Sequence, residues 1–233
     1  MKEIEEIESG GSLKLRGPIK FGRISVSGSL KLEGPAEGRE LNVSGSASID
    51  GAVKVKEMSV SGSAKIKELE GEEVKISGSL SIDGNVKADV LNISGSVKAN
   101  EKIDAKELYV FGSLQAKGAV GQKLRVSGKA IADELLFEEV RIGKESIVEA
   151  TIVGNEVIVE RKAEVEKIIG SKVVVEREAE VEYIEGEEVT IGREAEVMEV
   201  KYTKELKADP SAYIGKSEKI STLSRELPRR GQI

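Results

Sequence analysis

Pairs of serine hydroxyls recur around a glycine in the first half of the chain, as in Val26-Ser-Gly-Ser-Leu30 and Val43-Ser-Gly-Ser-Ala47. A serine becomes a nucleophile when a base such as histidine lies within hydrogen-bonding reach. The chain has no His and no Cys, which excludes Ser-His-Asp and Cys-His catalysis and any His or Cys ligand for zinc. The serines either form a flat hydroxyl face for lateral packing or for contact with ice or glycans, or repeat because small residues suit a recurrent turn. We favour the turn.

Adjacent carboxylates are the second candidate for chemistry, at Glu72-Glu73, Glu138-Glu139 and Glu187-Glu188. General acid–base catalysis needs a cleft and one carboxyl whose pKa is raised by burial. These pairs lie between apolar segments and are flanked by Lys and Arg, which is typical of a solvated face. Asp50-Gly51 and Asp83-Gly84 lack the Gly-Gly-x-Gly-x-Asp run of a calcium-binding repeat. We therefore predict no catalytic residue, no metal site, no cofactor and no enzymatic activity.

Charge and composition narrow the possible partners and the location. The chain has 36 Lys plus Arg against 42 Asp plus Glu, a net charge of -6 of well-mixed sign, which disfavours a nucleic-acid surface. The acidic start, residues 1–8, has no apolar signal-peptide run, and no segment reaches the roughly 18 apolar residues of a membrane span. We predict a cytoplasmic protein. Dense surface charge without Cys also suggests thermostability.

Internal repeats predict the fold. The residue that leads the Val/Ile-Ser-Gly-Ser phrase, or its later variants, recurs every 16 or 17 residues. These leading residues are Val26, Val43, Val60, Ile76, Ile93, Val110, Val126, Ile142, Val159, Val175 and Ile191. The first repeat can be traced back to Ser9–Leu13, which gives about twelve units. Such regular self-similarity is typical of a solenoid.

Within each unit the apolar residues alternate, and the alternation slips by one residue once per unit, for example between Val55 and Met58. Alternation predicts a strand with one buried face, and the slip predicts a corner. A unit of this length has no room for a crossover helix, so each unit is one coil of a parallel β-helix. The fold class is therefore all-β, with a right-handed coil by the usual crossover rule. A left-handed hexapeptide helix is the alternative, but its coil of three sixes does not fit the period.

The recurrent glycine falls where the alternation would point inward, between Val43 and Ala47 for example. In the second half we align this position with Lys144, Arg161, Arg177 and Arg193, which an apolar interior cannot hold. The position is therefore predicted to be a bend whose side chain reaches solvent. Neighbouring charged rows are expected to form ion-pair ladders.

The repeat is interrupted near the C-terminus by Asp209-Pro210-Ser211. We predict a β-helix over residues 1–206 and an irregular segment over 207–233. In that segment Ile220, Leu223 and Leu227 have helical spacing and could place a short capping helix over the last coil. A basic tail with Arg229 and Arg230 follows.

The remaining candidate residues concern self-association. The repeat begins at Leu13 and Leu15, preceded only by the strand-like Ile4 and Ile7, so no cap covers the first coil. Separately, the aromatic residues Tyr109 and Phe111 have outward parity. They form either an exposed contact site or rings folded over a neighbouring coil. We name these six residues as self-association candidates.

Two phrases carry a family resemblance: Ile82-Asp-Gly-Asn-Val86-Lys-Ala88 and Leu91-Asn-Ile-Ser-Gly-Ser-Val97-Lys-Ala99. Over about residues 20–135 the chain resembles the bactofilins, polymer-forming cytoskeletal proteins. The resemblance implies a right-handed, three-sided β-helix that assembles end to end into filaments without nucleotide, often near a membrane. The repeat is longer here, and the acidic start lacks the apolar membrane-targeting segment of some members. We therefore do not predict membrane attachment.

These observations predict a structural, cytoskeletal-type protein whose partner is a second copy of itself. The alternative is a non-enzymatic binding or spacer module, a rigid rod that displays a partner- or glycan-binding face along its serines.

Overall fold

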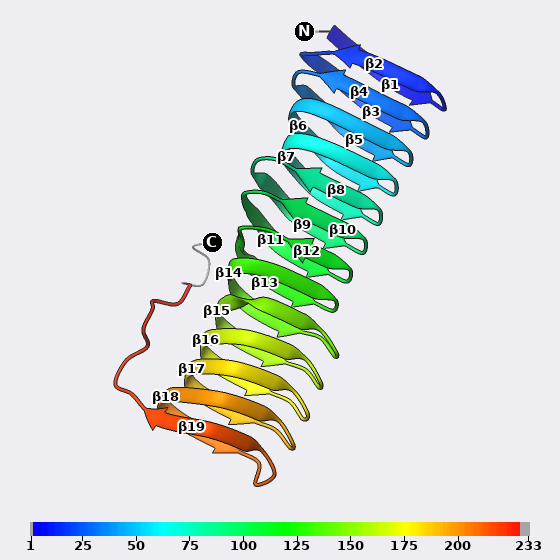
Figure 1. Ribbon diagram of the computed structural model, residues 1–233. Helices are drawn as coiled ribbons and strands as arrows, with labels where there is room; N and C mark the ends of the chain where they lie inside the picture. The colour runs from blue at the N-terminus through cyan, green and yellow to red at the C-terminus, as the bar shows by residue number, and fades with distance from the viewer. Residues whose placement is uncertain (1, 229–233) are drawn as a thin grey trace. The chain divides into compact units, whose positions relative to one another are not determined.

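The computed structural model describes residues 2–228, which contain strands β1–β19 and no helix. The strands pair in parallel and form a β-solenoid of about 13 turns with about 17 residues each (Figure 1). The all-β parallel solenoid predicted from the repeats is confirmed. The right-handed sense of the coil stays a prediction.

The chain divides into two compact units. The N-terminal unit comprises the residues up to Glu107 and Phe111–Lys117. Its strands are β1 (Lys2–Ser9), β2 (Ser12–Arg16), β3 (Ile19–Val26), β4 (Ser29–Glu33), β5 (Ala36–Val43), β6 (Ser46–Val60), β7 (Ser63–Ile76), β8 (Ser79–Ile82), β9 (Val86–Ile93), β10 (Ser96–Ala99), β12 (Ser113–Gln115) and the first part of β11 (Lys102–Val110).

The C-terminal unit comprises Leu108–Val110 and the residues from Gly118 onward. Its strands are β13 (Gly118–Val126), β14 (Lys129–Ile142), β15 (Ile147–Val159), β16 (Glu164–Val175), β17 (Glu180–Ile191), β18 (Glu196–Ala208), β19 (Tyr213–Lys219) and the end of β11.

Each coil pairs with its equivalent one repeat away, as the spacing predicts. Ile19 pairs with Ala36, Ala36 with Val53, and Val53 with Leu69. This register places chemically similar residues on top of one another in continuous rows. A row is therefore the structural counterpart of a position in the sequence repeat.

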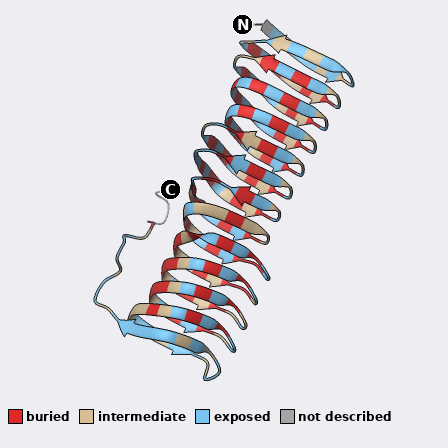
Figure 2. Ribbon diagram, in the orientation of Figure 1, coloured by how far each residue is buried: buried red, intermediate tan, exposed pale blue. Residues whose placement is uncertain are grey.

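Alternate residues of each coil point inward and are buried, and Figure 2 shows this pattern repeating along the strands. In one coil of the N-terminal unit the buried apolar side chains are those of Leu41, Val43, Ala47, Ile49, Val53 and Val55. The slip in alternation falls at Lys56 and Glu57, which are both exposed. The narrow interior holds aliphatic side chains almost throughout, which explains why so few aromatic residues suffice.

The Ser-Gly corner brings backbone atoms of successive coils into close contact. A Cβ atom added to Gly62 would lie 1.9 Å from the carbonyl oxygen of Gly45, and one added to Gly45 would lie 2.0 Å from that of Gly28. Glycine recurs at this corner because any side chain would collide with the coil before it.

The corner of the C-terminal unit is wider than the alignment of the repeats predicts. Val126 pairs with Ile142 and Lys129 with Ile147, so two additional residues enter the bend. The one-to-one alignment of the glycine with Lys144, Arg161, Arg177 and Arg193 is therefore wrong. Three of these side chains are exposed and that of Arg161 is half-buried, so the expected bend toward solvent is present.

A left-handed residue makes this wider bend possible. Glu145, Lys162, Glu178 and Glu194 have φ between 55° and 58°. The residues that follow them are fully buried and fill the corner from inside: Ser146, Ala163, Ala179 and Ala195. The expected ion pairs also form here, between Lys162 and Glu178 at 3.4 Å and between Arg193 and Glu194 at 3.5 Å.

The predicted boundary at residue 206 and the predicted capping helix are wrong. Strand β18 continues to Ala208, and β19 then adds a further strand that pairs with β18 from Tyr213 to Lys219. The backbone groups of residues 216–219 therefore form hydrogen bonds with β18 and cannot form those of the predicted capping helix. The segment 220–228 is irregular. Arg229 and Arg230 of the predicted basic tail lie outside the described residues.

Candidate self-association surfaces

The first coil of the N-terminal unit covers the second, but its own outer side has no partner within residues 2–228. Strand β1 pairs with β3, so Ile4 lies over Phe21 and Ile7 over Ile24. In the same way β2 pairs with β4 through Leu13 and Leu15. These four inward residues are half-exposed, whereas their partners in the next coil are buried. The four candidates thus form one apolar end surface, here called the N-terminal end.

The outward side chains around the N-terminal end are acidic. Glu3, Glu5, Glu6 and Glu8 are all exposed on β1. Arg23 lies 3.7 Å from Glu6 and donates a hydrogen bond of 3.0 Å to Glu40, and this bond raises the pKa of Arg23. Three of the four glutamates have no ion pair among the described residues, so the rim carries negative charge.

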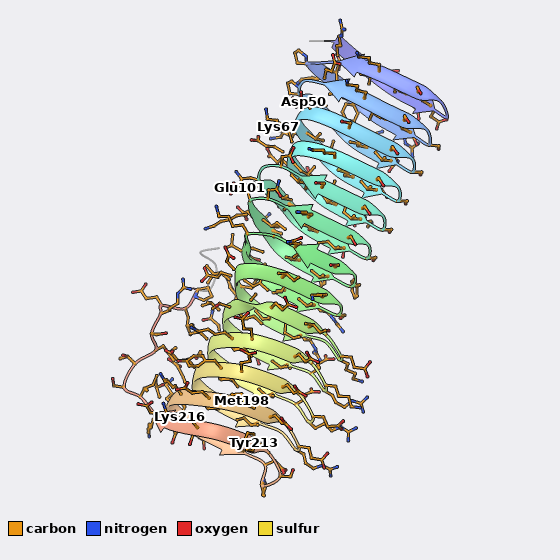
Figure 3. All side chains as sticks on the ribbon, in the orientation of Figure 1. Asp50, Lys67, Glu101, Met198, Tyr213 and Lys216 are labelled. Carbon is orange, nitrogen blue, oxygen red and sulfur yellow. The ribbon has the colours of Figure 1, made fainter. Side chains whose placement is uncertain are left out.

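The last coil of the C-terminal unit ends differently. The inward positions of β19 hold Ile214, Ser217 and Lys219, above Val197, Val200 and Tyr202 of β18. Figure 3 labels Tyr213 and Lys216 on this strand, and Tyr213 is 57% exposed. The end of this unit is therefore largely polar. The hydrophobic effect therefore favours association of the apolar N-terminal end more than association of this polar end.

The segment after β19 does not cross the last coil but runs back alongside β18 toward β14 (Figure 1). The amide of Ile220 donates a hydrogen bond of 2.9 Å to the carbonyl oxygen of Tyr202. Further along, Ser224 bonds to Glu185, and Asn155 Nδ2 donates to the carbonyl oxygen of Pro228 at 2.7 Å. We call residues 221–228 the strap. The cap candidates Leu223 and Leu227 are half-buried in it.

The strap covers a row of outward-facing residues on β14–β17. Leu136, Val153, Ile169 and Glu185 are successive register partners in this row. Val153, Ile169 and Glu185 are buried although they alternate with inward residues. Since the hydrogen bonds of Ser224 and Asn155 place the strap here, we assign their burial to it. This row, together with the strap-binding residues Asn155 and Glu134, is here called the strap groove.

Glu185 is the most buried carboxylate of the described residues, with 2% exposure. It accepts hydrogen bonds from the hydroxyl of Tyr183 at 3.0 Å and from Ser224 Oγ at 2.8 Å. The Lys167 ammonium lies 4.9 Å from the centre of the Tyr183 ring. The pKa of Tyr183 is raised to about 12. Desolvation by burial is the largest cause, and the hydrogen bond to Glu185 and its negative charge add to it. The hydrogen bonds from Tyr183 and Ser224 give the buried carboxyl group of Glu185 the polar partners that its burial requires.

We expect Tyr183 to ionise at higher pH than an unperturbed tyrosine, with a pKa of about 12 against the ordinary 10.0. Because the folded-state value is raised, its contribution to stability is present below about pH 10 and is lost as the pH rises toward 12. Tyrosinate absorbance of the parent and of Tyr183→Phe, compared during an alkaline titration, measures this. Glu185→Gln should lower the pKa of Tyr183 because it removes the neighbouring negative charge. A difference spectrum that titrates near pH 10 would contradict the assignment.

The two aromatic candidates lie in different units. Phe111 is 50% exposed, and its amide donates to the carbonyl oxygen of Ile93 at 2.7 Å. Its ring is therefore available for contact. Tyr109 is half-buried and borders a surface depression with Arg125 and Arg141. Exposure alone assigns neither residue to an interface.

The serine rows lie in register, as predicted. Ser46 pairs with Ser63, Ser63 with Ser79, and Ser79 with Ser96. All are exposed next to the glycine corner, which agrees with their interpretation as turn residues. On the opposite side of the same unit, Figure 3 labels the exposed charged residues Asp50, Lys67 and Glu101.

The C-terminal unit also carries an acidic face that the sequence repeats alone do not indicate. Glu164 pairs with Glu180, and Glu180 with Glu196, so three like charges stand in register. Like charges directly opposite one another are destabilising.

Within residues 2–228 no group of three or more Asp or Glu is placed to hold a metal ion. In that same range no helix is long and apolar enough to cross a membrane.

Residues 98–183 match a protein-family model described as GlmU-like, C-terminal hexapeptide. The match covers 86 of the 233 residues, so it supports a β-helix repeat protein without assigning the whole chain to that family. No curated protein and no solved structure matches the chain.

Proposed function

We propose that the chain is a cytoplasmic, non-enzymatic structural protein that self-associates through the N-terminal end. The half-exposure of Ile4, Ile7, Leu13 and Leu15, whose register partners are buried, carries this proposal. A second copy placed over these side chains would remove apolar surface from water. The edge strands of the first coil also expose backbone N–H and C=O groups that can form hydrogen bonds with a second copy. The resemblance to bactofilins implies assembly of the same kind.

The simplest arrangement is a two-fold pair in which two N-terminal ends meet, because the same surface then serves both copies. The exposed glutamates of β1 oppose this contact, since a two-fold brings like charges together. Salt screens such repulsion over about 10 Å at 0.1 M ionic strength. Association is therefore expected to strengthen as the salt concentration rises.

Leu13→Lys should abolish this association. The lysine would place a charge in the centre of the apolar end, where a second copy would have to bury it without a partner. Because Leu13 is half-exposed, the fold should survive. Light scattering over a range of protein and salt concentrations should give a lower average mass for Leu13→Lys than for the parent, and a thermal melt checks the fold.

Ser12→Lys is the matched control, because Ser12 lies on the same strand and faces outward. It should associate like the parent. A folded Leu13→Lys protein that still associates like the parent would rule out the N-terminal end as the interface. A monodisperse parent protein at all concentrations would instead favour the binding or spacer module.

A further inference from the structure

The strap groove recognises a particular peptide, namely residues 221–228 of this chain. Ser224 satisfies the buried Glu185, Asn155 binds the carbonyl oxygen of Pro228, and Arg225 forms an ion pair with Glu134. The apolar row between these anchors is covered by the strap. A second copy carries the same peptide, so its strap meets every requirement of this groove.

Unlike the strands of the solenoid, the strap has no ladder of backbone hydrogen bonds. Within residues 221–228 no backbone–backbone hydrogen bond is formed, and each anchor of the strap involves at least one side chain. Segments with few buried contacts open at low free-energy cost without unfolding the rest. The strap can therefore leave its groove while the coils of the C-terminal unit remain paired.

The direction of the strap is compatible with exchange between two copies. It leaves β19 at the end of the C-terminal unit and runs toward β14, away from that end. If two such ends face each other across a two-fold, a strap that continues forward enters the partner's groove from the partner's own end. Its polarity along that groove is then the same as in the structure.

The distances also allow exchange. From β19 to the partner's β17 there are three strand spacings of about 4.8 Å, or about 14 Å. The five residues from Lys219 to Ser224 span up to about 16–18 Å when extended. Ser224 can therefore reach the partner's Glu185 once Ile220 releases Tyr202.

We propose that the strap groove is a binding site for the strap of a second copy, so that two chains exchange residues 221–228 across their C-terminal ends. The exchanged strap makes the same contacts that it makes within one chain. The dimer gains in addition a contact between the two β19 edge strands. At low concentration each strap occupies its own groove because the tether favours it. The inference extends the proposed function to the other end of the chain but does not depend on the N-terminal contact.

Cross-linking of the full-length chain tests the exchange, since the native sequence has no Cys. Glu134→Cys places a thiol at the groove, and Arg225→Cys places one on the strap. A chain with both substitutions, treated with a bismaleimide at low concentration, should cross-link within itself. An equal mixture of the two single variants should give a covalent dimer whose fraction rises with protein concentration.

The controls separate exchange from random collision and from the N-terminal contact. Arg225→Cys mixed with Ser48→Cys, an exposed site of the N-terminal unit, should give no dimer above background. The exchange dimer should persist when every chain also carries Leu13→Lys. An intrachain product from the double variant without any dimer from the mixed single variants would overturn the proposal. Equal dimer yields with Ser48→Cys, or loss of the dimer in the Leu13→Lys background, would overturn it as well.

Discussion

Ile66→Asp should destabilise the protein severely, whereas Ser63→Asp should leave its stability almost unchanged. Both residues lie on β7, but Ile66 is 0% exposed in the apolar interior and Ser63 is exposed. An aspartate at position 66 would lose hydration without gaining a partner, and its neighbours Ile49 and Ile82 offer none. We expect a loss of about 4 kcal/mol or more in the free energy of unfolding.

Ser63→Asp should change the free energy of unfolding by less than about 0.5 kcal/mol, because surface substitutions away from special features rarely do more. Its register partners Ser46 and Ser79 are uncharged, so no like-charge pair arises. Chemical denaturation of the two variants and the parent measures both values. Equal stabilities for the two variants would mean that the assignment of inward and outward faces is wrong.

The solenoid could be predicted because its determinants are local and repeated. The alternation through Leu41, Val43, Ala47 and Ile49 places one side of each strand inward, and the same pattern recurs in every coil. A single misjudged residue does not alter such a prediction. The wider corner at Lys144 could not be predicted in this way, because its two extra residues leave the repeat length almost unchanged.

The strap and its groove could not be predicted in the same way. Ile220, Leu223 and Leu227 have helical spacing, but the ladder with β18 takes Lys216–Lys219 as a strand. Which surface the following residues cover depends on contacts between distant segments. One local signal was present: Ile168 and Ile169 are consecutive apolar residues, so one of them must face outward. An outward apolar row is a sign of a covering segment.

Gly62→Ala should be the most destabilising single-methyl change among the corner glycines. The added Cβ would lie 1.9 Å from the carbonyl oxygen of Gly45 and 2.4 Å from that of Ser44, and both are backbone atoms that cannot turn away. The coils would have to separate at this corner, which lengthens the hydrogen bond of 2.8 Å from the Ser63 amide to Gly45. Overpacking of this kind costs about 1–3 kcal/mol, and we expect the upper part of that range.

Gly10→Ala is the matched control and should act in the opposite direction. A Cβ at Gly10 meets nothing within 4 Å, and the residue has no positive φ that would strain alanine. Alanine reduces the freedom of the unfolded chain, so Gly10→Ala should stabilise the protein by about 0.4–1 kcal/mol. The opposite signs separate the close approach of the coils from the general effect of replacing glycine. If Gly62→Ala melted at or above the temperature of Gly10→Ala, the corner glycines would recur for a reason other than the contact between coils.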